Sequence, residues 1–599
     1  MIRVWLSFLI SLLLTCSLVL GAGGETTGES PGRTLHISPQ ALPEIAAELQ
    51  FRTISEAAAR VAAGDTVVIH SGTYREQVVV KASGTAEKPI QFVAAAGEHV
   101  VVTGADEITA WERADPEKNI YKTPWPHAFI IWNERNTHPD DDYHVVIGRA
   151  EQVFEDGYLL HQVLSRDEMS RGSFYVDLKA KLLYVWGYTD KTPGERSRVE
   201  ASVRDIVWDL RGDYNHVRGL RFRYAANRAQ QGAAQFRGDS NVIEDCVFER
   251  TNGCGAVFGG QSVVVRNCTF QDNGQMGFGA GRAHNLLFTG CTVRNNNTKN
   301  FDRGWEAGGN KIVFSRGVVI ENSMFVENRG HGLWFDIGNE DCEVRNCLFA
   351  DNEDCGIFYE ISYGLHVHDS VFVGNGFADS DGAWGASCGI SLSSSPGCVI
   401  ERNLIVGNKE GFNFREQERE TPHIRDAGVD EEERRDYPIW NHDELIRNNV
   451  LAFNRDAQAW GWFDVEDQRH WPAAMQEQSP PVSNREPDEP AWEGPSGLTL
   501  EQLKLSFQGN IYYAASGQGL FNWGTEWAKK RRQYTNLDDL RQELKLDTGS
   551  VVAEPDFADI IARDFRVPAD SALLRMRCYP QGEVPGVKLG IEQPSSQER

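Results

Sequence analysis

Apolar and polar positions recur along the chain with a long, regular period. The segments VIEDCVFERTNGCGAVF, VVRNCTFQDNGQMGFGA and EVRNCLFADNEDCGIFYE share one arrangement: an apolar stretch, a polar turn and a second apolar stretch led by glycine. Successive repeats lie about 23 residues apart, with two insertions of about ten residues. A small or polar residue marks the same position of each repeat: Cys246, Cys268, Cys291, Ser323, Cys347, Ser370 and Asn403.

Each repeat predicts two short β-strands joined by turns rich in Asn, Asp and Gly. A single coil of this kind cannot bury its apolar face, whereas stacked coils share one core and align their strands in parallel. Leucine-rich repeats have a similar period, but they need a helical segment and LxxLxL spacing, which this sequence does not have. The pattern therefore predicts an all-β fold, a right-handed parallel β-helix, with the hand set by the general preference of parallel crossover connections.

The pattern also divides the chain into regions. Ile54 to Ala63 predicts a short amphipathic helix that caps the open end of the core. The repeat is lost where aromatic segments such as SFYVDL and LLYVWGY predict an inserted β-sandwich-like domain. Near the end, TNLDDLRQELKLD predicts a helix with Thr535 as its N-cap. The predicted regions are 34–110 for the cap and first coils, 111–199 for the inserted domain, 200–416 for the main β-helix, and 417–599 for loop-rich C-terminal coils and a capping segment.

Residues 1–24 have the features of a signal peptide. Arg3 precedes the apolar run Val4 to Leu20, and small residues follow it. We therefore expect a secreted or periplasmic protein. Cys16 offers a lipid anchor as an alternative, but Thr15 is a poor fit to the small residue expected before a lipidated cysteine. No later stretch is apolar and long enough to predict a membrane span.

The net charge indicates which binding partners to expect, and the cysteine positions indicate whether disulfides or metal sites are expected. Asp and Glu number 86 against 60 Lys and Arg, which gives a formal net charge of −26. This balance argues against nucleic acid and favours a neutral substrate over a polyanion. The cysteines after the signal peptide stack at repeat positions, so we expect buried free thiols rather than disulfides. They form no paired CxxC groups, so no metal site is predicted.

The glycine-led strands carry the candidate chemistry. Alternation along GLWFD and GIFYE sends apolar residues inward and sends Trp334, Asp336, Phe358 and Glu360 outward. Asp336 and Glu360 then occupy equivalent positions of neighbouring coils, about 4.7–4.9 Å apart. Retaining glycosidases need two carboxyl groups separated by about 5–5.5 Å. Acidic residues on a sheet can simply keep it soluble, but directly stacked like charges are destabilising, which favours a catalytic pair.

Four further residues are predicted to bind substrate. Trp334 and Phe358 are expected to be exposed beside the acidic pair, where their rings would stack against sugars. Lys311 joins the same face one coil earlier, and Glu306 lies in the turn that leads into that strand. Arg415, two coils further on, is given a structural role.

The motifs EAGGNK at 306–311, GLWFD at 332–336 and FYEIS at 358–362 resemble, in order and spacing, those of glycoside hydrolase family 120. The resemblance touches most of residues 34–376. It implies a β-helix of the pectate lyase type with an inserted β-sandwich, β-xylosidase activity, Asp336 as nucleophile and Glu360 as acid/base. The sequence after residue 376 departs from the family, which leaves the substrate open.

The leading prediction is a secreted retaining glycoside hydrolase, β-xylosidase-like, that acts on plant or algal oligosaccharides without a cofactor. One alternative is a polysaccharide lyase, in which Glu306, Asp336 and Glu360 hold a divalent cation such as calcium and Lys311 acts as base. Basic residues that would hold several uronates are sparse in the sequence of this face, which argues against the lyase. The other alternative is a non-catalytic, glycan-binding β-helix.

Overall fold

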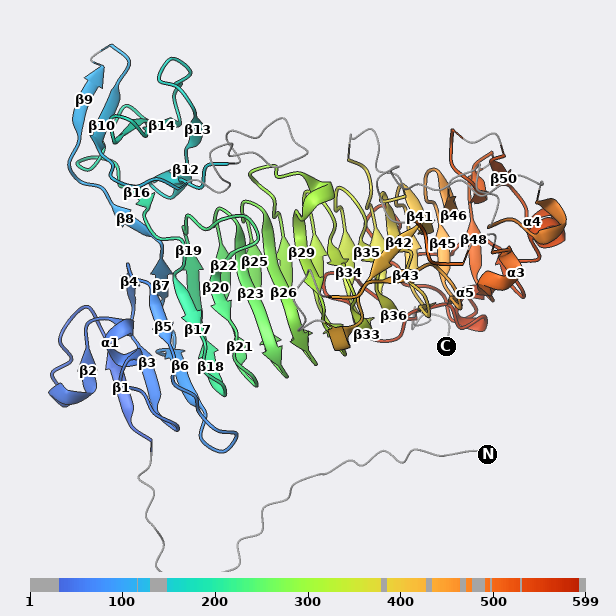
Figure 1. Ribbon diagram of the computed structural model, residues 1–599, viewed down its shortest axis with the longest axis horizontal. Helices are drawn as coiled ribbons and strands as arrows, with labels where there is room; N and C mark the ends of the chain where they lie inside the picture. The colour runs from blue at the N-terminus through green and yellow to red at the C-terminus, as the bar shows by residue number, and fades with distance from the viewer. Residues whose placement is uncertain are drawn as a thin grey trace, which may run out of the picture.

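The structure is a computed structural model. It describes residues 32–115, 117–129, 148–378, 385–426, 434–463, 470–476, 491–495, 498–515, 517–527 and 530–591. The predicted signal peptide, with Cys16, lies outside these residues. Successive coils stack along one long axis, and most coils add a strand to each of three sheets (Figure 1).

The three long sheets are named here A, B and C. Within the described residues, sheet A has 14 strands from β2 (Gln50–Phe51) to β47 (Ser506–Gln508), and sheet B has 13 from β4 (Gly72–Tyr74) to β51 (Val551–Val552). Sheet C also has 13, and its neighbours are parallel except for the last pair. Its strands are β5 (Val78–Val80), β17 (Trp208–Leu210), β20 (Gly232–Phe236), β23 (Cys254–Gln261), β26 (Met276–His284), β29 (Gly308–Val313), β32 (Leu333–Phe335), β35 (Ile357–Glu360), β38 (Cys388–Ser393), β41 (Glu410–Glu416), β46 (Ala457–Phe463), β49 (Gly519–Trp523) and β50 (Arg532–Tyr534).

The prediction of two strands per coil is wrong, because most coils have three. The first apolar stretch of a repeat is split between sheets A and B, as in β21 (Val242–Glu244) and β22 (Val247–Glu249). Asp245 turns the chain between them with φ of 55°, in the left-handed region. Asn and Asp tolerate this conformation better than most residues. Since the corner takes only two residues, the sequence pattern runs through it without a visible break.

Inward-facing residues form one continuous core along the coils. Phenylalanines stack from coil to coil, with ring centroids 4.8 Å apart for Phe248 and Phe270. The ten cysteines that the structure describes are all free and buried, as predicted. Cys268 and Cys291 occupy the same position of successive repeats, and the backbone N–H of Cys268 donates to Sγ of Cys291 at 3.4 Å.

A ladder of buried asparagines fixes the corner between sheets B and C. In each step, the side-chain amide of one asparagine donates to Oδ1 of the next, at 2.8–3.0 Å. The same amide group also donates to a backbone carbonyl, as Asn352 does to Phe325 at 2.9 Å. Buried turn groups are thereby hydrogen-bonded, which an apolar residue could not achieve. The ladder consists of Asn273, Asn296, Asn328, Asn352, Asn375, Asn408 and Asn454.

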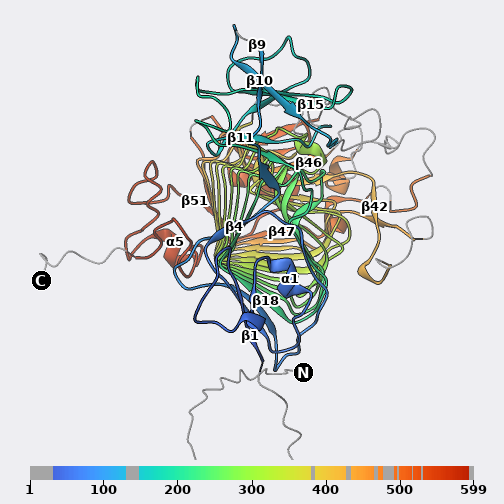
Figure 2. The same ribbon diagram turned by 90° about the vertical axis from the view of Figure 1, so that its left-hand side faces the viewer.

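Helices cover the two ends of the core. Helix α1 (Ile54–Ala58) lies over the N-terminal end (Figure 2), and Thr53 and Glu56 form its capping box. It ends before the predicted Ala63. The C-terminal region contains α3 (Leu500–Leu503), α4 (Leu537–Leu544) and α5 (Ala572–Arg575). The N-cap of α4 is Asn536, so the assignment of Thr535 is wrong. Of the helices in the described residues, none has the length and apolar character needed to cross a membrane.

Two small sheets interrupt the coils between β7 (Val100–Thr103) and β17, and they project beside the N-terminal coils (Figure 1). They pack around a separate apolar cluster that includes Phe174, Leu183 and Val185. The predicted β-helix with an inserted β-sandwich-like domain is confirmed. The strands of the insertion are β8 (Ala105–Glu107), β9 (Glu112–Asp115), β10 (Ile120–Pro124), β11 (Val153–Glu155), β12 (Tyr158–Leu159), β13 (His161–Val163), β14 (Ser173–Asp177), β15 (Leu182–Trp186) and β16 (Val199–Ser202).

Candidate active site

The outer face of sheet C carries the two predicted catalytic carboxylates. Strands β32 and β35 pair in parallel, with Trp334 opposite Phe358 and Phe335 opposite Tyr359. Phe335 and Tyr359 point into the core and are fully buried. Asp336 and Glu360 follow them at the next position of each coil, on the outer face. Both carboxylates are nevertheless buried, because other segments cover this part of the face.

Lys311 links Asp336 to Glu306. Its Nζ lies 2.8 Å from Oδ2 of Asp336 and 3.0 Å from Oε1 of Glu306. It also lies 4.3 Å from the centroid of the Trp334 ring. Glu306 has φ of 74°, a conformation that costs a residue other than glycine roughly 1–3 kcal/mol. The structure therefore brings Glu306, Lys311 and Asp336 together, as the sequence predicted.

Two arginines lie on the other side of the pair. Arg419 Nη1 contacts Oε1 of Glu360 at 2.8 Å. Arg415 is on β41, and its guanidinium lies 5.7 Å from the centroid of the Phe358 ring. Arg419 belongs to β42 (Arg419–Thr421), which pairs with β43 (Tyr437–Ile439) in a hairpin beside the stacked coils (Figure 2).

These arginines correct the prediction that basic residues are sparse on this face, and they place Arg415, expected to be structural, near the carboxylate pair. In the structure, Arg415, Arg419 and Lys311 all bear electrostatically on Glu360. Alternation along β41 had already placed Arg415 on this face. Arg419 lies outside the repeat, so the periodic pattern offered no signal for it.

The surroundings raise the pKa of Asp336 and lower the pKa of Glu360. Burial, together with the charge of Glu360, raises the pKa of Asp336 to about 6, although Lys311 acts in the opposite direction. Burial also acts to raise the pKa of Glu360, but Arg419, Arg415 and Lys311 outweigh it and hold that pKa below its usual value. At neutral pH both groups are ionised, and Asp336 is the first to accept a proton as the pH falls.

Several polar atoms on this face are buried without a hydrogen-bond partner in the described residues. They are Oδ1 of Asp336, Nε1 of Trp334, Oγ of Ser393 and Oδ1 of Asn413. Ser393 pairs with Glu360 on one side and Arg415 on the other in the strand register. Buried polar groups are normally satisfied, so this concentration of donors and acceptors is suited to a ligand rich in hydroxyl groups.

Trp334 and Phe358 are not placed as predicted. Each is only 3% exposed, so the expectation that they stack on sugars as exposed rings is wrong. His331 packs against both, with ring centroids at 4.9 Å and 4.6 Å. Cys355 and Cys388 complete this cluster. The rings instead support Lys311 and Arg415 through cation–π contacts, which favours a fixed position for both cations.

Comparison with known proteins supports the fold. The family model described as "Right handed beta helix region" matches residues 232–405. The solved complex of XylC with xylose aligns with a TM-score of 0.60 and 18% identity, over 83% of this chain and 87% of that chain. The pectate lyase Pel9A aligns over 89% of this chain and 84% of its own, with 14% identity and a TM-score of 0.32. The predicted right-handed parallel β-helix is thus confirmed.

One curated relative is also similar over a short segment. The uncharacterized protein YwoF of Bacillus subtilis (strain 168) is 38% identical over 106 residues. That segment is 17% of this chain and 23% of YwoF, so the match spans less than a quarter of the relative's length.

Proposed function

We propose that this protein is a secreted retaining glycoside hydrolase that acts on xylose-containing or similar oligosaccharides. The observation that carries the proposal is the buried pair Asp336 and Glu360, at matching positions of adjacent coils, in which each carboxylate contacts its own cation. Two carboxyl groups on neighbouring strands suit the double displacement of retaining glycosidases. The motif resemblance to glycoside hydrolase family 120 and the fold likeness to XylC support the same reaction.

In this reaction Asp336 is the nucleophile. Lys311 contacts its carboxylate, and a pKa of about 6 leaves most of the group ionised at neutral pH. The carboxylate attacks the anomeric carbon and forms a glycosyl ester, while the bond to the leaving oxygen breaks. Glu360 gives its proton to that oxygen. Glu360 then takes a proton from water, and the hydroxide attacks the anomeric carbon, which releases Asp336 and the sugar.

This assignment requires Glu360 to hold a proton when the substrate is bound. Arg419 favours the ionised form of Glu360 in the structure. Its side chain is 32% exposed, and the hairpin that bears it lies outside the coils. We propose that the substrate displaces Arg419 from Glu360. Burial then dominates and raises the pKa of Glu360, as a general acid needs.

The lyase alternative needs a divalent cation among Glu306, Asp336 and Glu360. The ammonium group of Lys311 already lies between Glu306 and Asp336, at 3.0 Å and 2.8 Å, so a calcium ion would compete with it for both carboxylates. Arg415 and Arg419, on the other hand, are basic side chains that could hold uronates, so a lack of basic residues no longer argues against the lyase. The hydrolase is therefore preferred, and the experiment below separates the two reactions.

The test is turnover of a panel of aryl glycosides, xylosides first, by the wild type and two variants. Glu360→Gln should lower kcat/KM by about 10²–10⁴-fold, because a general acid is lost. Asp336→Asn should abolish turnover. Glu244→Gln, on the outer face of sheet A, is the control and should act as the wild type.

Azide then assigns the roles. With Glu360→Ala it should give a glycosyl azide of retained configuration, and with Asp336→Ala one of inverted configuration; exchanged outcomes would reverse the assignment. If the protein forms products that absorb ultraviolet light from uronate polymers, and does so only with calcium, it is a lyase and not a hydrolase. If it binds glycan without converting it, it is a glycan-binding protein.

A further inference from the structure

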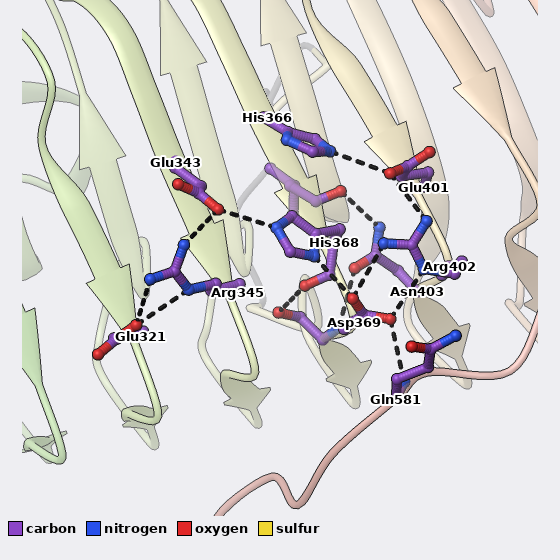
Figure 3. A network of polar contacts seen from close by, with 12 residues as sticks. Glu321, Glu343, Arg345, His366, His368, Asp369, Glu401, Arg402, Asn403 and Gln581 are labelled. Atoms are coloured by element: carbon purple, nitrogen blue, oxygen red, sulfur yellow. Dashed lines mark hydrogen bonds and ion pairs between the residues drawn. The ribbon is translucent and has the colours of Figure 1, made fainter. Parts of the chain in front are cut away.

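The outer face of sheet A carries two histidines on one strand. His366 and His368 belong to β36 (Tyr363–His368), and alternation along a strand places both on the same face. The neighbouring strand β33 (Glu340–Arg345) sets Glu343 opposite His366 and Arg345 opposite His368. On the other side, β39 (Val399–Glu401) sets Glu401 opposite His368. Figure 3 shows these side chains converging above three adjacent coils.

The distances fit a metal ion. One ligand atom each from Glu343, His366 and His368 lies within 4.8 Å of the other two, the one such group found in the described part of the chain. His368 Nε2 is 3.0 Å from Oε1 of Glu343. His366 Nε2 is 3.2 Å from Oε1 of Glu401, which lies beside the group. Imidazole nitrogens and carboxylate oxygens are ligands that zinc and other late first-row metal ions accept.

Asp369 provides a second, independent feature. His368 Nδ1 lies 2.7 Å from Oδ2 of Asp369 (Figure 3). In metal sites a ligand histidine typically donates its second ring N–H to a carboxylate, which fixes the tautomer and aims the other nitrogen at the ion. Asp369 is itself held by Arg402 at 3.0 Å and by the backbone N–H of Gln581 at 3.0 Å. Nε2 of His368 is thereby directed toward Glu343.

A ladder of alternating charges also occurs here and is the simpler explanation. The strand register aligns Glu321, Arg345, His368, Glu401 and Arg447 across five coils. Arg345 contacts Glu343 at 2.6 Å and would compete with a metal ion for it. His366 lies in the next row, where its Nε2 contacts Glu401 of the ladder and its ring centroid lies 4.4 Å from that of His368. Two imidazoles side by side, each with a ring nitrogen near a glutamate, point to a shared cation.

We propose that Glu343, His366 and His368 form a binding site for a divalent transition-metal ion of the zinc class. The ion joins two adjacent coils, and the Asp369 contact extends the site to the C-terminal segment at Gln581. The site lies on sheet A, whereas the carboxylate pair lies on sheet C, so the ion stabilises the fold and takes no part in catalysis. The side chain of His366 is 41% exposed, which leaves a route of entry for the ion.

The test uses the full mature chain, without a polyhistidine tag and treated with a chelator. Calorimetric titration with Zn²⁺ should show one ion per chain and a rise in Tm, and Co²⁺ should give visible d–d absorption. His366→Gln with His368→Gln should remove all three signals. Asp369→Asn should weaken binding by about 10–100-fold. Arg345→Gln should strengthen it, since a competing cation is lost, whereas a ladder alone predicts no such gain.

The control is His36→Gln with His70→Gln, a second histidine pair on sheet A whose ring nitrogens lie 3.1 Å apart. It should bind zinc like the wild type. Absence of 1:1 binding, or binding that survives the loss of His366 and His368, overturns the proposal. So does binding lost only in the control. If the double variant has a lower Tm than the wild type in chelator, its substitutions destabilise the fold by themselves. Glu343→Gln then replaces it, and this variant should also lose zinc binding.

Discussion

Lys311 places its ammonium nitrogen 2.8 Å from Oδ2 of Asp336, and it does so from the preceding coil of the same sheet. Asp336 is buried and lies near Glu360, so it would otherwise have little reason to remain ionised. The contact lowers the pKa of Asp336 against both effects. Lys311 is therefore the residue through which the ionisation of the proposed nucleophile is most directly tested.

Lys311→Met should move activity to higher pH. Without the cation, the pKa of Asp336 rises above its present value of about 6, and a larger fraction of the group is protonated at pH 7. A protonated carboxyl cannot attack, so kcat/KM at pH 7 should fall roughly tenfold for each unit by which the pKa exceeds 7. The measurement is the pH profile of kcat/KM, whose acidic limb should shift upward. Lys81→Met is the control. An acidic limb that stays at the same pH in Lys311→Met contradicts the prediction.

Arg419→Gln should extend activity to higher pH. Arg419 lowers the pKa of Glu360, so its removal raises that pKa and leaves a larger fraction of the proposed acid protonated at a given pH. The basic limb of the kcat/KM profile should therefore move up, and activity at pH 7 should persist. Arg425→Gln, next to the same hairpin, should leave the limb in place. A basic limb that stays fixed or moves down in Arg419→Gln would show that Glu360 is not the acid.

Asn352→Ala should destabilise the coils. The side chain donates to the carbonyl of Phe325 at 2.9 Å, and its Oδ1 accepts from the backbone N–H of Asn328 at 3.2 Å, so alanine leaves both buried groups without this partner. Each unsatisfied buried group costs about 1–3 kcal/mol. Urea unfolding followed by circular dichroism measures the loss, and the exposed Gln542→Ala is the control. A loss no larger than that of the control would mean that the ladder adds nothing to stability.

The cysteines from Cys246 to Cys578 should behave as buried thiols. All ten are free in the structure, and burial raises the pKa of Cys254 well above its ordinary value and that of Cys347 to about 12. A thiol reagent at neutral pH should therefore react slowly with the native protein and with all ten thiols once it is unfolded without reductant. In the unfolded chain without its predicted signal peptide, which contains Cys16, fewer than ten reactive thiols would reveal disulfides.

The sequence determined the solenoid and the carboxylate pair. A period of about 23 residues, and alternation within each strand, are local properties that decide which side chains face the core. Phe335 and Tyr359 face inward for this reason, and Asp336 and Glu360 face outward as predicted. Lys311 follows from the same register one coil earlier.

Only the tertiary structure decided what covers that face and what lies on the other sheets. Arg419 comes from a hairpin outside the repeat, and Trp334 and Phe358 are buried by contacts that strand alternation cannot reveal. Glu343 and His366 are 23 residues apart in sequence, yet they lie opposite each other because one coil separates them. Alternation fixes which way a side chain points relative to its own strand, whereas its burial and its partners depend on segments that the chain brings back from a distance.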